Sequence, residues 1–425
     1  MIKFSKTTTI ALVAALLVSP VAIRAQDLSR ATPEEVGMSS DRLERLSRAL
    51  RGYVDTGRVP GSVTLVARHG KVVYLEAFGH RDLEAGDPMT SDAIFRIASQ
   101  TKALVSVAVM ILQEEGRLLI TDPVGNYLPE FLETTVAVSN DSGGYAVVDA
   151  ERPITIRDLL THSAGIGYGL GLASDQWEEA GIQGWYFADR DEPIGATVAR
   201  MADIPFATQP GERFMYGYST DILGHLVERV SGTTLDAFLA SRIAGPLGMD
   251  DTHFYLPPDK VDRLTVVYSH TDNGALERAP DPGEMVGQGA YVDGPRKSFS
   301  GGAGLLSTAM DYARFLQMLL NRGEFDGTRV LGRLSVNQMT VPHVKELPWN
   351  EGTGFGLGFM IVEDVGAWGE MGTVGSYTWG GAYHSSYWVD PTEDLLIVHF
   401  TQIIPTRNLD DHDKVRTLVY QAVVD

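Results

Sequence analysis

The stretch Phe95-Arg96-Ile97-Ala98-Ser99-Gln100-Thr101-Lys102 leads directly into an apolar segment, Ala103 to Leu112. Apolar residues at positions 104, 105, 108, 109, 111 and 112 fit a helix that is buried over most of its surface. Gly116 follows, as is typical of a helix C-terminus. The pattern therefore places Ser99 in or just before the first turn of a core helix.

Ser99 has two interpretations at this position. A serine at a helix start often caps a free backbone N–H group and does nothing else. Lys102, however, lies three residues later on the same helical face, within reach of the hydroxyl. Apolar neighbours strip a lysine amine of water and favour its neutral form, which can take the proton of a serine nucleophile. An S-x-x-K pair also arises by chance, so this hypothesis requires support from elsewhere in the chain.

Length and composition describe a globular protein with a large core. The 425 residues are 44% hydrophobic, which suffices for one two-lobed domain or for two domains. The chain has no cysteine, which excludes a disulfide framework, a lipid-anchor cysteine, a thiolate nucleophile and a zinc–thiolate site. The formal charge of −20 argues against nucleic acids and anionic membrane surfaces as partners.

Residues 1–25 are predicted to be a secretory signal peptide. Lys3 and Lys6 precede an apolar run, Ile10 to Val18, that is too short for a comfortable membrane span. Ala25 supplies a small residue at the expected cleavage position. Cleavage would remove the three cationic residues Lys3, Lys6 and Arg24, and the formal net charge of the remaining chain would be −23. We therefore expect residues 26–425 to form a periplasmic or secreted protein without a stable membrane anchor.

The remaining pattern predicts an α+β fold in which both ends of the chain contribute to a sheet. An amphipathic helix over Ser40 to Val54 precedes two strands, 62–67 and 71–76, joined by a tight hairpin at His69-Gly70. Three more strands are predicted near the other end, at 358–362, 383–389 and 395–401, followed by a helix over 410–423. We expect a sheet lobe of residues 35–98 and 330–425 around a helical lobe of residues 99–329.

The predicted helical lobe contains two turn-rich segments. Its helices are expected over residues 156–162, 197–202, 219–230, 235–243 and 308–320, the last with a cap at Thr308. Two turn-rich segments separate these helices. The first is residues 165–195, which are rich in glycine, aromatic and acidic residues, and the second is residues 257–300. Residues 165–195 either lie over a functional site or form a solvated insertion, and residues 257–300 are a second segment that would border such a site.

Two further motifs support a catalytic role for Ser99. Tyr216-Gly217-Tyr218 lies in a turn just before a helix, and Trp379-Gly380-Gly381 follows later in the chain. In order and spacing the three motifs resemble the S-x-x-K, Y-x-N or Y-x-S, and K-T-G, H-x-G or W-x-G motifs of the serine β-lactamase and penicillin-binding protein superfamily. Over residues 35–423 the chain is similar above all to class C β-lactamases and the related family VIII carboxylesterases. The resemblance implies a β-lactamase-like fold, with an antiparallel sheet flanked by N- and C-terminal helices and a mostly helical lobe.

The resemblance also implies a role for each motif residue. Ser99 would attack the substrate carbonyl, and Lys102 and Tyr216 would share the general-base and general-acid work. The N–H groups of Ser99 and Ala382 would form the oxyanion hole. The residues that would bind the substrate are Tyr218, Trp379, Gly380 and Gly381. The two glycines would let an edge strand run close to the substrate. The resemblance implies no cofactor and no metal.

The chain departs from the superfamily pattern at three places. Trp379 replaces the lysine of K-T-G, so it supplies no second cation to hold a substrate carboxylate. Tyr218 replaces the amide side chain that orients the acylamino group of β-lactams. Both departures weigh against β-lactams and peptides as substrates. His384 and Ser385 replace the Gly-Thr common in the esterases, and the resemblance gives them no role.

Two rival kinds of enzyme fit the sequence less well. An α/β-hydrolase requires G-x-S-x-G, and no serine here has glycine at both flanking positions; Ser163 matches half of the motif and is predicted to be structural. The ten histidines show neither H-E-x-x-H nor clustered ligand spacing, which argues against a metal enzyme.

We therefore predict a secreted serine hydrolase that cleaves small-molecule carboxylic esters through an acyl-enzyme on Ser99. A weak β-lactamase, a D-aminopeptidase or DD-peptidase, and an acyltransferase of the same superfamily are the alternatives within the enzyme class. A non-catalytic penicillin-binding-like module is the alternative outside it.

Overall fold

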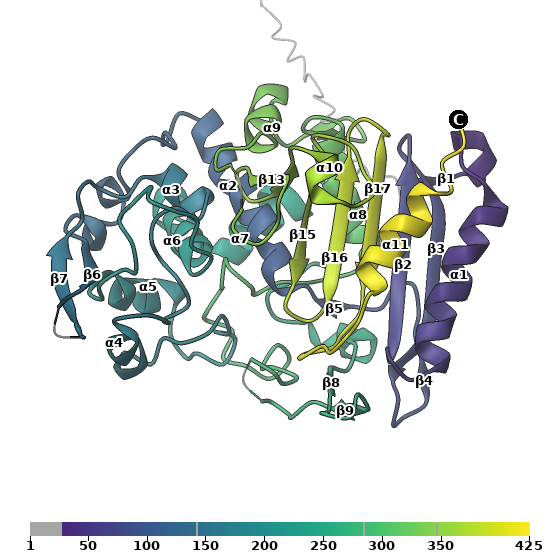
Figure 1. Cartoon of the computed structure of the whole chain (residues 1–425), viewed down its shortest axis with the longest axis horizontal. Helices are drawn as coiled ribbons and strands as arrows, with labels where there is room; N and C mark the ends of the chain where they lie inside the picture. The colour runs from purple at the N-terminus through teal and green to yellow at the C-terminus, as the bar shows by residue number, and fades with distance from the viewer. Residues whose placement is uncertain (1–27, 142, 284, 346) are drawn as a thin grey trace, which may run out of the picture.

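The computed structural model describes residues 28–141, 143–283, 285–345 and 347–425 (Figure 1). The predicted signal peptide, residues 1–25, lies outside the described residues. Within the described ranges, no helix is both long enough and apolar enough to cross a lipid bilayer.

One sheet is assembled from both ends of the chain, as the sequence predicted. Its spatial order is β1-β3-β2-β17-β16-β15-β14-β13, with β4 paired to β3. The strands are β1 Ser29–Arg30, β2 Gly61–Arg68, β3 Lys71–Asp82, β4 Asp87–Pro88, β13 Thr353–Phe355, β14 Met360–Val362, β15 Tyr377–Gly381, β16 Ser385–Asp390 and β17 Leu395–Phe400. The pair β1–β3 is parallel and the other pairs of this sheet are antiparallel. The predicted antiparallel sheet and the β2–β3 hairpin are thereby confirmed.

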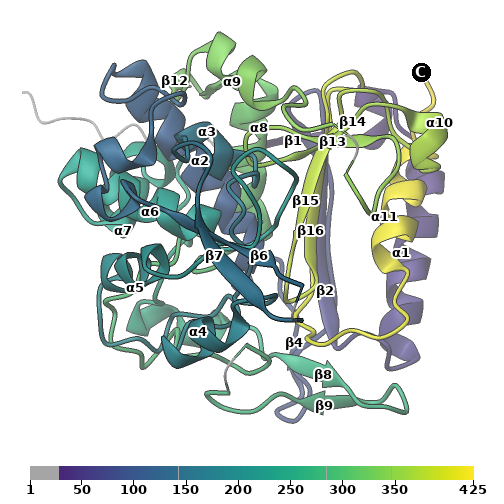
Figure 2. The ribbon, with the colours of Figure 1, turned by 60° about the vertical axis from the view of Figure 1, so that its left-hand side comes forward.

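Helices cover both faces of this sheet (Figure 2). Helix α1 (Ser40–Asp55) and helix α11 (Asp411–Tyr420) pack side by side on one face. Helix α8 (Ala309–Leu320) packs on the other face against β2, β16 and β17, although the sequence placed its residues in the helical lobe. Its predicted cap is present, because Thr308 Oγ1 accepts the Asp311 N–H at 3.1 Å. The fold is therefore α+β, with the sheet between two helical layers.

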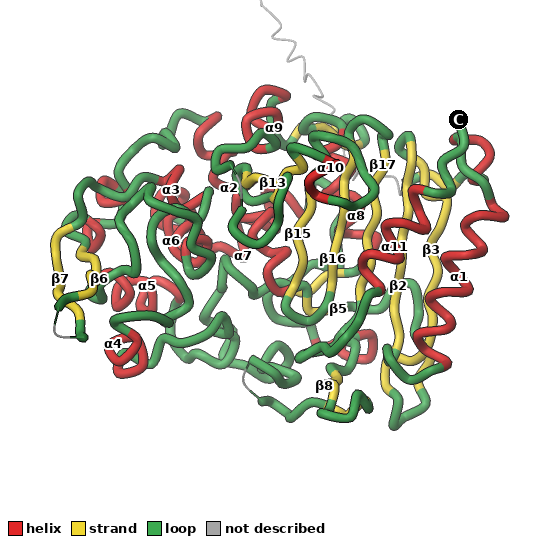
Figure 3. The backbone as a smooth tube through the Cα atoms, viewed as in Figure 1, coloured by secondary structure: helices red, strands yellow, loops and turns green. Residues whose placement is uncertain are grey.

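The helical lobe lies beside the sheet and contains long connecting loops (Figure 3). Its helices are α2 Thr101–Glu114, α3 Ile156–Leu160, α4 Ser174–Glu179, α5 Ile194–Ala202, α6 Ser219–Ser231 and α7 Leu235–Leu239. Two hairpins in this region, β6 Thr135–Ser139 with β7 Tyr145–Asp149 and β8 Tyr268–His270 with β9 Leu276–Arg278, were not predicted. The remaining short elements are β5 Phe95–Arg96, β10 Leu306–Ser307, β11 Glu324–Phe325, β12 Thr328–Arg329, α9 Arg333–Met339 and α10 Val365–Trp368.

Helix α2 forms the centre of the core. Every residue from Thr101 to Leu112 is buried, which explains why apolar side chains occupy nearly all of its surface. It packs against α6 on the side of the helical lobe. The segment that carries Ser99 is thus fixed by the largest apolar cluster of the protein.

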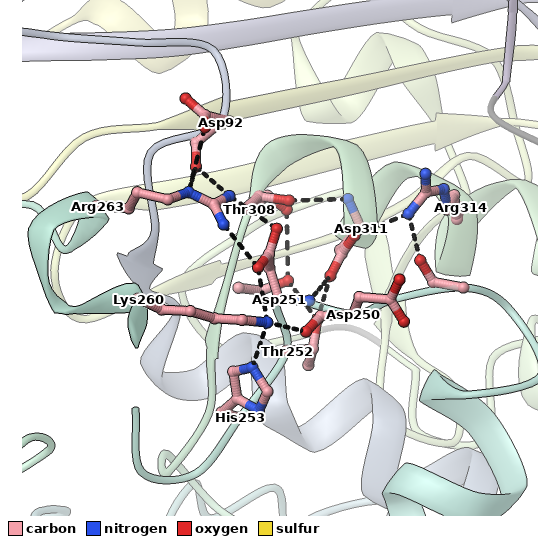
Figure 4. A network of polar contacts seen from close by, with 12 residues as sticks. Asp92, Asp250, Asp251, Thr252, His253, Lys260, Arg263, Thr308, Asp311 and Arg314 are labelled. Atoms are coloured by element: carbon pink, nitrogen blue, oxygen red, sulfur yellow. Dashed lines mark hydrogen bonds and ion pairs between the residues drawn. The ribbon is translucent and has the colours of Figure 1, made fainter. Parts of the chain in front are cut away.

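A polar network anchors the turn-rich segment 250–263 to the start of α8 (Figure 4). Asp251 pairs with Lys260 at 2.9 Å and with Arg263 at 2.7 Å. Asp311, in the first turn of α8, accepts the backbone N–H of Asp251 at 2.8 Å and pairs with Arg314 at 2.9 Å. Burial raises the pKa of the Asp311 carboxyl to about 6. The network therefore fastens part of the second turn-rich segment to the helix that lies on the sheet.

Asp158 stabilises α3 and its removal is expected to destabilise the protein. Thr155 Oγ1 accepts the Asp158 N–H at 3.1 Å, Asp158 accepts the Thr155 N–H at 2.9 Å, and Arg152 donates two bonds to the carboxylate at 2.6 and 3.0 Å. For Asp158→Ala we expect the free energy of unfolding at pH 7 to fall by about 1–2 kcal/mol. Urea titration measures this difference, with the exposed Asp149→Ala as control.

The same variant has a defined pH dependence. Burial acts to raise the pKa of Asp158, but its hydrogen bonds with Arg152 and Thr155 outweigh burial and hold the pKa below the ordinary 3.8. The stabilisation is therefore fully present above pH 3.8 and is lost as the pH falls through the lower pKa of the folded state. A wild-type advantage over Asp158→Ala that stayed constant down to pH 2 would contradict this account.

Candidate active site

Ser99 sits on a single turn of 3-10 helix, Ala98–Gln100, at the N-terminus of α2. Ala98 adopts a φ of 41°, in the left-handed region, which turns the chain sharply from β5 into the helix. Ser99 is partly exposed, whereas its neighbours Ala98 and Gln100 are fully buried. The turn thus leaves the Ser99 side chain accessible to solvent, while the buried residues on either side hold its backbone in place.

Lys102 connects three parts of the site. Its Nζ lies 3.3 Å from Ser99 Oγ, 3.2 Å from the Tyr168 hydroxyl and 2.7 Å from the carbonyl oxygen of Gly302. The side chain is only 2% exposed, and its Nζ lies 4.6 Å from the centre of the Tyr216 ring. The structure therefore brings Ser99, Lys102 and Tyr216 together, as the resemblance implies.

Asp221 supports the lysine through the Gly301-Gly302 loop. It lies on α6, is 1% exposed, and accepts bonds from Ser300 Oγ at 2.6 Å and from Gly302 N at 3.0 Å. Burial raises the pKa of the Asp221 carboxyl, and the charge of Lys102 opposes that rise. A side chain at position 302 would collide with this carboxylate. Asp221 therefore fixes the carbonyl group that receives Lys102, a role that the sequence analysis did not identify.

Tyr216 is held by aromatic contacts and one hydrogen bond. Trp379 Nε1 donates to its hydroxyl oxygen at 3.0 Å, and the two rings lie 5.2 Å apart. On its other side, the buried ring of His162 lies 4.7 Å away. Burial lowers the pKa of His162 well below 6.5 and the charge of Lys102 adds to this effect, so this imidazole is neutral. Tyr216 and Trp379 are themselves partly exposed.

Strand β15 passes directly beside the turn that carries Ser99. Residues 377 and 378 pair with β14 as well as β16, while 379–381 pair with β16 alone among the described strands. A Cβ atom at Gly381 would collide with the carbonyl oxygen of Ile97, so this close approach requires glycine. Ala382 packs in one apolar cluster with Ala98. The predicted oxyanion residues Ser99 and Ala382 therefore lie on adjacent segments.

Tyr168 comes from the turn-rich segment 165–195, which does reach the site. Its hydroxyl accepts a bond from Lys102, and its ring packs edge-on to Tyr216 at 5.7 Å. Burial raises the pKa of Tyr168 well above 10, so this residue keeps its proton. Nothing in the sequence singles out Tyr168, because its flanking glycines resemble those of any surface loop.

Tyr218 is placed differently from the other motif residues. Its side chain is fully buried behind Tyr168 and packs against Trp177 at 5.5 Å and Phe187 at 5.8 Å. It therefore contributes to the support of the site in this structure, and its role in substrate binding stays a prediction. Ser163 donates within its own turn, to Asp158, and shares a 2.8 Å contact with Thr161.

Removing the Tyr168 hydroxyl is expected to slow catalysis. Tyr168→Phe deletes one hydrogen bond to the Lys102 amine while the ring stays in place, and we expect kcat/KM to fall by about tenfold. Steady-state kinetics on an ester substrate measures this, with Tyr377→Phe as the matched control, since that buried hydroxyl has no partner among the described residues. Equal kinetics for both variants would show that the bond to Lys102 is unimportant.

The chain is similar to known proteins over most of its length. The family described as Beta-lactamase matches residues 46–421. The chain is 34% identical to protein Rv1367c of Mycobacterium tuberculosis, covering 85% of this chain and 90% of the relative. It is 33% identical to esterase EstB of Burkholderia gladioli, covering 81% and 86%. Among solved structures, EstCE1, a hydrolase with promiscuous acyltransferase activity, superposes with a TM-score of 0.79 at 28% identity, covering 89% of this chain and 98% of that one.

The match extends over most of the chain, and its range spans the three motifs that begin at Ser99, Tyr216 and Trp379. The chain therefore belongs to the Beta-lactamase family, within the serine β-lactamase and penicillin-binding protein superfamily, as one of its esterase-like members.

Proposed function

We propose that the protein is a carboxylesterase that forms an acyl-enzyme on Ser99. The observation that carries this proposal is the pair of Ser99 and Lys102, with 3.3 Å between the hydroxyl oxygen and the amine nitrogen. A partly exposed serine beside a buried lysine is an arrangement suited to nucleophilic attack on an acyl carbon. The names of EstB and EstCE1 support hydrolysis as the reaction class.

The proposed reaction has two halves. Ser99 Oγ bonds to the ester carbonyl carbon as Lys102 takes the hydroxyl proton, and the N–H groups of Ser99 and Ala382 stabilise the resulting oxyanion. Collapse of this intermediate breaks the bond to the alcohol, which leaves with a proton supplied through Lys102 and Tyr216. Water then attacks the acyl-enzyme, loses its proton to the same groups and releases the carboxylic acid, which regenerates Ser99.

Esters fit this site better than β-lactams. Trp379 occupies the position where β-lactamases carry a lysine, and its indole N–H is already engaged by Tyr216 at 3.0 Å. It offers no charge to a substrate carboxylate. The partly exposed strand segment at 379–381 presents backbone groups and an aromatic surface instead, which suits a neutral acyl group of modest size.

Parallel assays on two substrate classes test the proposal. The mature protein is incubated with p-nitrophenyl butyrate and, separately, with a chromogenic cephalosporin. We expect ester turnover to exceed cephalosporin turnover by a wide margin. A dominant cephalosporin rate would move the assignment to a β-lactamase, and the absence of any covalent adduct with either substrate would favour a non-catalytic binding module.

Acyl transfer is a second candidate activity, supported by the acyltransferase activity named for EstCE1. An alcohol that replaces water in the second half-reaction would take the acyl group from Ser99. Addition of a primary alcohol to the p-nitrophenyl butyrate assay, with product analysis by mass spectrometry, distinguishes transfer from hydrolysis.

We also propose that the protein is exported. The two N-terminal lysines, the short apolar run and Ala25 support cleavage before Gln26. Intact-mass analysis of protein recovered from the periplasm or medium tests this, because cleavage predicts a chain that begins at Gln26.

A further inference from the structure

His384 occupies an unusual backbone position in the turn between β15 and β16. Its φ is 65°, in the left-handed region that a residue other than glycine adopts at a free-energy cost. The side chain is 14% exposed and points into a contact with α11 rather than into solvent. Such strain persists when the surrounding structure holds the residue in place.

The partners of His384 are polar and buried. His384 Nε2 lies 2.8 Å from Asp411 Oδ1, and the other carboxylate oxygen lies 3.1 Å from His399 Nε2. The remaining nitrogen of His399 contacts Thr64 Oγ1 at 2.7 Å. Asp411 and His399 are each 1% exposed. Asp411 Oδ2 is thus held by the buried His399, and Asp411 Oδ1 contacts His384.

A third imidazole, that of His412, completes the cluster. Its ring stacks on the ring of His384, with centroids 4.0 Å apart and an interplanar angle of 15°. His412 Nε2 is buried and has no hydrogen-bond partner in the described part of the chain. A buried nitrogen left in this state is unfavourable unless a ligand satisfies it.

We propose that His384, Asp411 and His412 bind one divalent transition-metal ion of the zinc type. One ligand atom from each of the three residues lies within 4.8 Å of the others. Two imidazole nitrogens and one carboxylate oxygen are a donor set that Zn²⁺ accepts, with a fourth position for water. Zinc–nitrogen bonds of about 2.0–2.1 Å require the three atoms to draw together, through rotation of the His384 and His412 side chains on binding.

The surroundings suit such a site. His399 and Thr64 orient the Asp411 carboxylate from outside, as partners of metal ligands commonly do. His412 also lines a cavity of about 230 Å³ together with Trp379, Gly380 and Ser386, which offers the ion and its water an approach. Because His384 follows Ala382 by two residues, a bound ion would tie the turn of the oxyanion hole to α11. The site thus lies next to the catalytic groups without including them.

Calorimetric titration of the untagged, chelator-treated protein with ZnCl₂ tests the proposal, and Co²⁺ serves as a spectroscopic probe. We expect one Zn²⁺ per chain and visible d–d absorption from bound Co²⁺. His384→Gly removes a ligand and suits the backbone conformation at this position, so the variant should fold. His412→Phe keeps a ring against His384 and removes both nitrogens. Each variant is expected to bind Zn²⁺ at least about tenfold more weakly.

His69→Gln is the matched control, because His69 also contacts a carboxylate, that of Asp394 at 3.0 Å, but on the exposed surface. It should bind Zn²⁺ as the wild type does. The proposal is overturned if the wild type binds no Zn²⁺, if His384→Gly and His412→Phe bind as tightly as the wild type, or if His69→Gln is weakened equally. None of these readouts depends on ester turnover.

Discussion

Replacing Ser99 with alanine is expected to lower kcat/KM for p-nitrophenyl butyrate by about four orders of magnitude. The variant retains the buried lysine, the aromatic residues and the N–H groups, so it should bind the ester while forming no covalent bond to it. Intact-mass spectrometry with a slowly hydrolysed ester should show the acyl adduct on the wild type and none on Ser99→Ala.

Ser163→Ala is the control for this experiment. Ser163 is the serine that half-matches the α/β-hydrolase motif, and it is buried in contact with Thr161. We expect this variant to keep its acyl adduct and most of its turnover. Loss of the adduct in Ser163→Ala, with full activity in Ser99→Ala, would reverse the assignment of the nucleophile.

Substitution of Lys102 is expected to have the second largest effect. Lys102→Met fills the same space with an apolar chain, removes the group that takes the Ser99 proton and should reduce kcat/KM by about three orders of magnitude. Because the Gly302 carbonyl oxygen loses the amine that donates to it at 2.7 Å, the melting temperature should also fall.

Lys102→Arg separates the charge from the proton transfer. An arginine can still donate to the Gly302 carbonyl, but it is always protonated and cannot take the Ser99 proton. We therefore expect Lys102→Arg to be nearly as inactive as Lys102→Met while melting closer to the wild type. Substantial turnover by the arginine variant would exclude Lys102 as the base and transfer that role to Tyr216.

Local patterns predicted much of the fold. Helix α1 begins at Ser40 as its amphipathic pattern indicated, the hairpin at His69-Gly70 joins β2 to β3, and the Thr308 cap starts α8. Each of these features depends on residues close together in the sequence. The hairpin β6–β7 escaped prediction because β7 is largely exposed and lacks the alternation of a half-buried strand.

The candidate site was predictable where a motif spans a few residues and not where distant segments meet. Ser99 and Lys102 are three residues apart on one helix, so their contact follows from helical geometry. The hydrogen bonds between Gly302 and Asp221 and between Lys102 and Tyr168 join segments that are far apart in the sequence. No local rule predicts which distant segments meet. The same holds for His384 and Asp411, whose contact depends on how α11 docks on the sheet.

The pairing of β2 with β17 makes the sheet depend on the last part of the chain to be synthesised. The pairs of β2 and β17 run from Leu395↔Arg68 to Phe400↔Val63, so most of the chain lies between the two strands. An unfolded chain brings such distant segments together slowly. When α2 has left the ribosome, Ser99 and Lys102 have already been made, but β15, which ends at Gly381, and Ala382 after it emerge only near the end of translation. A partly made chain would therefore carry the proposed nucleophile without the segment proposed to stabilise the oxyanion, so under the proposed function ester hydrolysis requires the last quarter of the chain.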